Sequence, residues 1–268
     1  MKEIKDINQL KKIQLEVMDY FHNWCQENGV TYFITAGTLI GALRHKGFIP
    51  WDDDIDVVML RSDYERMLTM YRNDGRYKLY TIETDETCIY PYAKIYDSKT
   101  VMIECDETDH PAIGVNIDIF PLDSVTDNYE DGVRLKKDIQ MLDSILNVKH
   151  LDRNDRGFLK NMVVSILRFF AKFYSYPYLI KKVIKKSKKY LNNNDSRYIV
   201  NAVIYAKGEK EILDREWFAS TMDLEFEGRQ YKAPVGADQY MRRLFGDYMQ
   251  LPPEDKRTSH HRFKAYYK

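Results

Sequence analysis

The chain of 268 residues has little cysteine, no long apolar run and no net charge. Its three cysteines, Cys25, Cys88 and Cys105, are odd in number and show no C-x-x-C spacing. This argues against a disulfide framework and a cysteine zinc site, and it fits a reducing compartment. No stretch reaches the ~18 uncharged apolar residues of a membrane span. Residues 1–12 lack the apolar core of a secretory signal, so we expect a cytoplasmic globular protein.

The absence of net charge conceals a segregated distribution. The chain has 41 lysine and arginine residues and 41 acidic ones. Residues 156–194 contain ten basic residues and no acidic one, so the remainder holds 31 basic residues against 41 acidic ones. That acidic remainder argues against a nucleic-acid partner, because nucleic-acid-binding proteins usually show a basic surplus. Two chemically different surfaces are expected.

Hydrophobic periodicity predicts an α+β chain. In the first part, helices are expected at 6–28, 39–46 and 62–71, and strands at 32–36, 55–60, 77–83, 91–96, 100–105 and 115–120. Ser62 and Glu65 have the spacing of a capping box, and Pro121 and Asp123 are expected to end the last strand. Further on, helices are expected at 128–149, 158–175, 177–191, 195–206 and 236–245, with a hairpin turn at 227–228. This layout divides the chain into a catalytic core, 1–127, and a mostly helical part, 128–268.

The most informative stretch runs from Gly37 to Asp56 and has four acidic residues at positions 52–56. If Asp54 begins a strand, Asp54 and Asp56 project from the same face, because strand side chains alternate. Two such carboxylates form a site for Mg²⁺, with Mn²⁺ as an alternative, and Mg²⁺ completes its shell with water and substrate phosphates. Asp118 lies in an apolar strand, where an unpaired carboxylate is costly, and it is the best candidate for a third acid.

Residues before the acidic run have the chemistry to hold a phosphate. Gly37 and Thr38, at a strand-to-helix turn, can present backbone N–H groups to it. Arg44 and Lys46 follow and can clamp its oxygens; the alternative is a basic helix end that complements the helix dipole. For the acidic run itself, the alternatives are a solvated loop and a structural Ca²⁺ site.

The run from Ala36 to Met59 resembles the signature of the LicD family, relatives of fukutin within the nucleotidyltransferase fold. The resemblance extends to three later blocks and the C-terminal region: Lys94–Asp97, Ile117–Asp123, Leu244–Met249, and Pro252-Pro253 through to His260-His261. It implies a nucleotidyltransferase-like mixed sheet with flanking helices, plus a helical subdomain. It also implies transfer of phosphocholine, or a similar phospho-substituent, from a CDP-linked donor to a sugar hydroxyl. The acceptor would be a lipid-linked cell-surface glycan or teichoic acid precursor.

The resemblance also implies roles for single residues. Asp54 and Asp56 fall on the family's metal-binding pair, and Asp118 on its third acid, which would share a metal or accept the proton of the acceptor hydroxyl. Gly37 and Thr38 fall on its phosphate-binding turn. The residues expected to contact substrate are Gly37, Thr38, Arg44, Lys46, Trp51, Tyr92, Lys94, His260 and His261.

A quaternary ammonium donor calls for aromatic side chains around the cation. Trp51, Tyr90 and Tyr92 are candidates, although aromatic residues more often belong to the core. The resemblance favours a C-terminal tail that folds back over the site, so that His260 and His261 lie near phosphate. The alternative for this tail is a solvated basic segment.

Residues 158–191 combine apolar stripes with lysines. One predicted helix carries a stripe from Phe158 to Phe173, and the next is loaded with lysines between Lys181 and Lys189. Such helices can lie on an anionic membrane surface, which would place the protein on the inner face of the membrane. The alternative is a subdomain that packs its apolar faces on the catalytic half and leaves the lysines solvated. The two are compatible, since one stripe can pack while the other docks.

The carboxylates are also compatible with a second enzyme. A nucleotidyltransferase that transfers a whole NMP to a phosphorylated small molecule would use the same residues. It would form a CDP-linked compound rather than consume one. A third possibility is a nucleic-acid-binding protein that uses only the lysine cluster, against which the acidic remainder argues.

Overall fold

A computed structural model describes residues 1–104, 112–150, 158–204, 207–257 and 263–268. Its helices are α1 (Ile7–Asn28), α2 (Ala36–His45), α3 (Arg61–Met70), α4 (Tyr129–His150), α5 (Phe158–Ala171), α6 (Tyr176–Ser187) and α7 (Ala237–Phe245). Its strands are β1 (Lys2–Ile4), β2 (Phe33–Ile34), β3 (Asp56–Leu60), β4 (Tyr77–Tyr80), β5 (Ala93–Asp97), β6 (Thr100–Glu104), β7 (Asn116–Ser124), β8 (Tyr198–Val200), β9 (Ile212–Asp214), β10 (Thr221–Phe226), β11 (Arg229–Pro234) and β12 (Phe263–Tyr267). Within these ranges no helix combines the length and the apolar character needed to cross a membrane.

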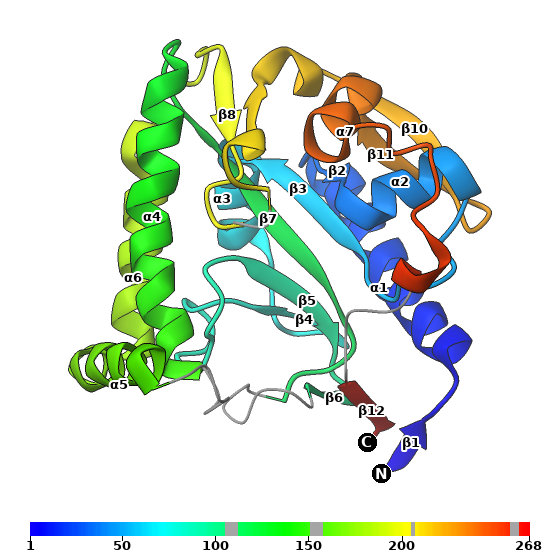
Figure 1. Cartoon of the computed structure of the whole chain (residues 1–268). Coiled ribbons are helices and arrows are strands. Elements are labelled where there is room, and N and C mark those ends of the chain that lie inside the picture. The colour runs from blue at the N-terminus through cyan, green and yellow to red at the C-terminus, as the bar shows by residue number, and fades with distance from the viewer. Residues whose placement is uncertain (105–111, 151–157, 205–206, 258–262) are drawn as a thin grey trace.

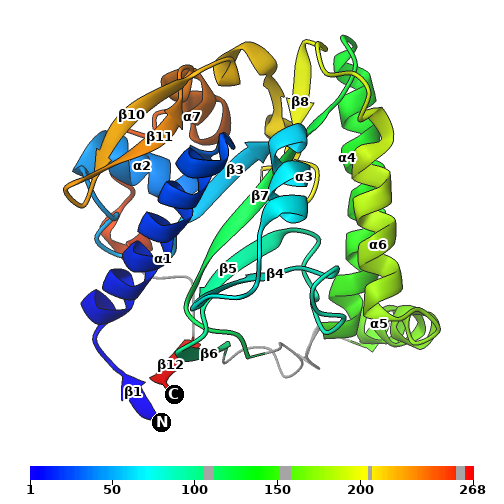
Figure 2. The same ribbon diagram turned by 180° about the vertical axis from the view of Figure 1, so that it is seen from behind.

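The central sheet is mixed and carries the predicted site. Its strands run in the order β2-β3-β7-β5-β4, and β8 and β9 continue from the far end of β7. β3 and β7 are parallel, while the other neighbours pair antiparallel. α1 and α3 pack on one face, turned toward the viewer in Figure 2, and α4, α5 and α6 stand together at one side of the molecule (Figure 1). The α+β class and the mixed sheet with flanking helices are confirmed.

α1 illustrates how local sequence sets the ends of an element. The Asp6 carboxylate accepts the Asn8 N–H at 2.9 Å and so satisfies a free donor of the first turn. Gly29 ends the helix at φ 60°, in the left-handed region that favours glycine. Val17 and Phe21 are fully buried on the face that packs against the sheet. The helix predicted in this region is confirmed.

β7 runs past the point where the sequence predicts its end. The expectation that Pro121 and Asp123 stop it is wrong. The Asp118 N–H donates to the Ile55 C=O on the β3 side at 3.0 Å, so by alternation the nitrogen of Pro121 points away from β3. On that other side β5 pairs only with residues 116–119. The missing N–H of Pro121 therefore removes no ladder hydrogen bond.

The helix predicted at 195–206 is also wrong, because residues 198–200 form β8. Its residues Ile199 and Val200 are β-branched and fully buried, which suits a strand. They extend the ladder by pairing with the end of β7. The decisive signal is the pairing with two neighbouring strands: β7, more than 70 residues earlier in the chain, and β9, which follows β8.

The capping box expected at Ser62 and Glu65 is wrong: α3 begins at Arg61, and no side chain caps its first turn. Arg61 is buried and joins three elements instead. Its Nε donates to Asp123 on β7 at 2.7 Å, and its Nη2 donates to the Ser187 hydroxyl on α6 at 3.1 Å. Its Nη1 lies 3.2 Å from Glu65. Because a buried guanidinium is costly unless paired, these contacts hold α3, the sheet and α6 together.

β10 and β11 form a hairpin whose turn is the one expected at 227–228. Glu227 and Gly228 have φ of 52° and 71°, as a two-residue hairpin turn requires. The Glu227 carboxylate accepts the Phe48 N–H at 3.1 Å, and the Glu227 N–H donates to the Lys46 C=O at 2.8 Å. The tip of the hairpin therefore fixes the loop that follows α2.

Gly41 lies where α2 passes close to the loop that follows it, and a side chain at this position should destabilise the fold. A Cβ at position 41 would lie 2.4 Å from the carbonyl oxygen of Gly47. Because backbone cannot move aside as a flexible side chain can, we expect Gly41→Ala to lower the free energy of unfolding by ~2 kcal/mol or more. Thermal unfolding measures the loss. Gly75→Ala, whose Cβ meets nothing within 4 Å, is the matched control, and equal melting temperatures for the two variants would contradict the prediction.

Candidate active site

The parallel pairing of β3 with β7 brings two of the predicted carboxylates together. Asp56 lies opposite Asp118 in the register, which the hydrogen bond from the Asp118 N–H to the Ile55 C=O helps to fix. Burial, together with the carboxylates of Asp54 and Asp118, holds the pKa of Asp56 well above its ordinary value of 3.8. The three predicted acids thus form one electrostatic group, whose ionisation a nearby cation would favour.

Lys94 on β5 supplies such a cation within the protein. It lies opposite Asp118 in the antiparallel register, and its Nζ is 2.7 Å from the Asp118 carboxylate. The same Nζ lies 3.5 Å from the side-chain oxygen of Asn116. Lys94 is buried, whereas the Asp118 side chain keeps 20% of its surface exposed. Asp118 is therefore held in place and still accessible.

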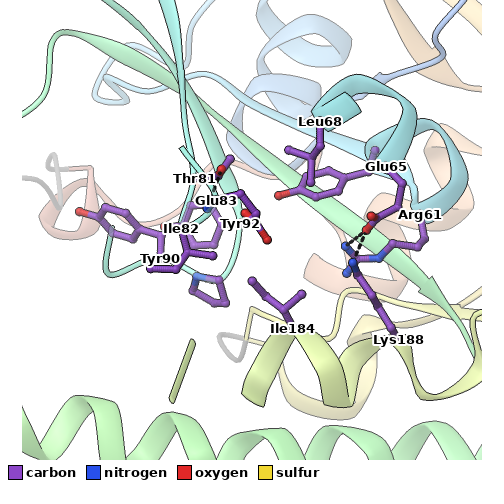
Figure 3. A pocket seen from close by; sticks show the side chains of 12 residues that line it. Arg61, Glu65, Leu68, Thr81, Ile82, Glu83, Tyr90, Tyr92, Ile184 and Lys188 are labelled. Carbon is purple, nitrogen blue, oxygen red and sulfur yellow. Dashed lines mark hydrogen bonds and ion pairs between the residues drawn. The ribbon is translucent and has the colours of Figure 1, made fainter. Parts of the chain in front are cut away.

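Two of the three predicted aromatic residues, Tyr90 and Tyr92, lie beside this internal cation. The Lys94 Nζ lies 4.4 Å from the ring centre of Tyr90 and 5.6 Å from that of Tyr92. Tyr92 also packs on Phe120 with 4.5 Å between ring centres. Both tyrosines line a cavity that Ile184 of α6 closes from the other side (Figure 3). Its volume of about 10 Å³ leaves room for about one water molecule, which is too little for a trimethylammonium group.

The start of α2 is tied to β3, the strand that begins with Asp56. The Thr38 hydroxyl accepts the Asp56 N–H at 2.9 Å, and the Thr35 N–H donates to the Asp56 C=O at 3.0 Å. Ala36, between them, has φ of 46°, a conformation that costs a non-glycine residue free energy. The surrounding hydrogen bonds thus impose the backbone course that brings α2 next to Asp56.

Gly37 lies against the side chain of Asp52, which would have to shift to admit a side chain at position 37. A Cβ there would lie 2.1 Å from the Asp52 carboxylate oxygen. This close approach places a negative charge against the first turn of α2, where free N–H groups and the helix dipole favour anions. Binding of a donor phosphate by Gly37 and Thr38 stays a prediction.

Of the two basic residues that follow this turn, Arg44 contacts the C-terminal segment. Arg44 donates from Nη1 to the Tyr248 C=O at 2.7 Å. The Arg257 guanidinium lies 5.8 Å from the ring centre of Trp51. Lys46 ends α2 in the left-handed region. The segment from about residue 248 to 257 therefore lies beside α2 and Trp51.

Two predicted residues, His260 and His261, lie outside the described residues. The chain resumes in β12, which pairs with β1 and β6 at the end of the molecule where both termini lie (Figure 1). Contacts with substrate stay predictions for the whole expected set: Gly37, Thr38, Arg44, Lys46, Trp51, Tyr92, Lys94, His260 and His261.

The carboxylates fit a magnesium ion that is shared with a phosphate ligand. Among the described residues, no three His, Cys, Asp or Glu side chains are grouped closely enough to hold a metal ion by themselves. Mg²⁺ that is bound together with a phosphate ligand needs only one or two carboxylates, because water and the phosphate complete its shell. Asp56 and Asp118 meet that requirement, and the repulsion that raises the pKa of Asp56 is what a cation would relieve.

Comparison with known proteins places the chain in a family. The model "LicD/FKTN/FKRP, nucleotidyltransferase domain" matches residues 29–147, which contain the three acids and Lys94. The lipopolysaccharide cholinephosphotransferase LicD of Haemophilus influenzae is 32% identical over 264 residues, 94% of each chain. The chain belongs to the LicD family. The family resemblance expected from the sequence is thereby confirmed, and it extends across nearly the whole chain.

Two shorter similarities accompany this match to LicD. An uncharacterised protein of Rickettsia typhi is 34% identical over 73 residues, 26% of this chain and 24% of the relative. A second, from Rickettsia prowazekii, is 42% identical over 48 residues, 18% of each chain. Both cover too little of either protein to add to the family assignment.

Sequence reasoning missed two contacts that shape the site. The first is the pairing of Lys94 with Asp118. The sequence shows only that these two residues have opposite charges and lie in two predicted strands, because nothing local indicates that the strands are neighbours. The hydroxyls of Thr35 and Tyr240 lie 2.6 Å apart although the residues are 205 positions apart. This bond ties α7 to the turn before α2, and no sequence pattern signals it.

The raised pKa of Asp56 should make the free energy of unfolding depend on pH. The folded state binds its proton more tightly than the unfolded state, so the stabilising contribution present below about pH 4 is lost as pH rises through the folded-state pKa. In metal-free protein at about pH 7.5, we expect Asp56→Asn to raise the free energy of unfolding by ~1 kcal/mol, or the melting temperature by ~2–4 °C. Thermal unfolding in a chelating buffer measures this.

The control for this experiment is Asp74→Asn, a change at an exposed position. It should leave the melting temperature unchanged. The destabilisation of wild type between about pH 4 and neutrality should also be smaller in Asp56→Asn. A melting temperature below that of wild type for Asp56→Asn would show that the ionised carboxylate stabilises the fold, against the prediction.

Proposed function

We propose that this protein transfers a phosphocholine-type group from a CDP-linked donor to a sugar hydroxyl of a lipid-linked cell-surface glycan precursor. The observation that carries the proposal is the similarity to a lipopolysaccharide cholinephosphotransferase, at 32% identity over 94% of both chains. The juxtaposition of Asp56 and Asp118 supports it, because phosphoryl transfer depends on positioning and charge neutralisation more than on covalent catalysis.

In the proposed reaction, the acceptor hydroxyl oxygen attacks the phosphorus that bears the choline group. The bond from that phosphorus to the bridging oxygen breaks, and CMP leaves with the electron pair. The hydroxyl proton passes to a base. Asp118 suits this role because its carboxylate is partly exposed and is oriented by Lys94 at 2.7 Å.

Asp56 and Asp118 would hold Mg²⁺ while water and the donor phosphates complete its shell, and Asp54 would add negative charge beside them. A bound Mg²⁺ would supply charge neutralisation on the donor phosphates. The first turn of α2, at Gly37 and Thr38, offers N–H groups to the same phosphates. Lys94 places a positive charge beside Asp118 and so reduces the electrostatic cost of bringing an anionic donor to an acidic site.

Asp118→Asn tests the proposed base. We expect transfer to fall by ~100-fold or more, because an amide cannot accept the proton. The measurement uses CDP-choline labelled in the choline group and a purified glycan acceptor with Mg²⁺ present. Circular dichroism checks the fold, and Asp74→Asn should keep wild-type turnover. Near-normal turnover in a folded Asp118→Asn would remove Asp118 from the mechanism.

A second label separates the two enzyme classes. With cytidine and choline labelled differently, the proposal expects choline label in the glycan and cytidine label in free CMP. Cytidine label attached to an acceptor would identify NMP transfer by the same carboxylates instead.

Lys94→Met tests whether the ammonium group and a metal share the charge of Asp118. The substitution keeps an apolar stem and removes the charge. We expect Mg²⁺ to bind ~10-fold more tightly to the variant and to raise its melting temperature more than that of wild type, because binding to the folded state stabilises it by mass action. Lys12→Met, at an exposed position on α1, is the control. An equal or smaller Mg²⁺ effect in Lys94→Met would argue against a shared site.

A further inference from the structure

The two apolar stripes expected in residues 158–191 differ in their burial. On α6, Leu179, Ile180 and Val183 are buried, and the helix packs against α4. On α5 and the residues just after it, large apolar side chains lie 46–72% exposed: Met162, Val163, Ile166, Leu167, Phe169 and Phe173. One stripe belongs to the core, and the other forms an apolar face on the surface.

This apolar face has a fixed position on the protein. Ala171, at the end of α5, is buried. The Arg168 Nε donates to the Val148 C=O near the end of α4 at 3.3 Å, which anchors α5 to α4. Both views show α5 lying across one end of the α4–α6 pair, at a corner of the molecule (Figures 1 and 2). Phe169 and Phe173 pack edge to face with 5.6 Å between ring centres.

Lysines lie on α6, the helix that shares this corner of the molecule with α5 (Figures 1 and 2). An open groove between α4 and α6 is lined by four lysines, one acid and two apolar residues: Lys182, Lys185, Lys186, Lys189, Asp138, Met141 and Leu142. Asp138 pairs with Lys186 at 2.8 Å, so the groove keeps a positive excess. Residues 158–191 contain no acid. The corner formed by α4, α5 and α6 therefore presents an apolar face on α5 and an excess of positive charge along α6.

We propose that this surface docks on a bilayer containing anionic lipid, with the α5 face inserted among the headgroups and the α6 lysines against lipid phosphates. Aromatic and aliphatic side chains with flanking lysines match the layered chemistry of such an interface, where a phosphate layer covers hydrocarbon. The surface is separate from the acidic site on β3 and β7, so this proposal does not rest on the proposed transfer reaction.

Charge complementarity favours a membrane over a second copy of this chain. A two-fold interface would place the same face on both partners and bring lysine clusters toward one another. A bilayer with anionic headgroups supplies the opposite charge instead. It also accepts exposed phenylalanines, which a purely electrostatic partner such as nucleic acid would leave in water.

The test is flotation of the full-length protein with vesicles of phosphatidylcholine alone or mixed with phosphatidylglycerol. We expect binding to the anionic vesicles and little to the neutral ones. Lys182→Glu with Lys185→Glu should lower the vesicle partition coefficient by ~10-fold or more, since each lysine near an anionic surface adds to binding. Lys5→Glu with Lys12→Glu, the same charge change near the N-terminus, should have little effect.

Phe169→Ser with Phe173→Ser tests insertion separately from charge. Both side chains are exposed, so the fold should be retained, and the partition coefficient should fall by ~10-fold or more. Wild type that does not bind anionic vesicles would overturn the proposal, as would equal binding by this variant. Sedimentation velocity tests the alternative, a second copy of this chain on the same face. A wild-type dimer that becomes monomeric in Phe169→Ser with Phe173→Ser would assign the face to a dimer interface and overturn the proposal.

Discussion

The parallel pairing of β3 with β7 is the constraint on which the candidate site depends. It sets Asp56 beside Asp118, and the antiparallel β5 on the other side of β7 then brings Lys94 to the same point. Because side chains alternate along a strand, a slip of one residue in either ladder would turn one of these groups to the opposite face. Three residues from distant parts of the sequence thus act as one electrostatic unit only in this register.

The site concentrates features that cost the fold free energy. Asp56 is held among other carboxylates, Ala36 is held in the left-handed region, and the Asp52 carboxylate is held close to the backbone of Gly37. All of them lie around the first turn of α2. Conflicts between local preference and the observed structure are expected at functional sites, where rigid surroundings compensate for them. Here the surroundings are the buried sheet and the hydrogen bond from Asp56 to Thr38.

The features that the sequence predicts well are local. α1 follows from its periodicity with Asp6 and Gly29 at its ends, and the hairpin follows from a two-residue turn with positive φ. Asp56 and Asp118 could be assigned to strands because each stands out in an apolar run. The predictions that were wrong depend on neighbouring strands. Residues 198–200 form a strand because they pair with the end of β7 and with β9, and β7 continues past Pro121 because its pairing with β5 ends at residue 119. Periodicity contains no information about which strands pair.

Arg61 gives the molecule a mechanical property as well as a buried ion pair. Through Asp123 and Ser187 it fastens α6 to the strand that carries Asp118. These hydrogen bonds couple the position of α6 to that of the sheet. A surface that held α6 would also set the direction in which the carboxylates of β3 and β7 face.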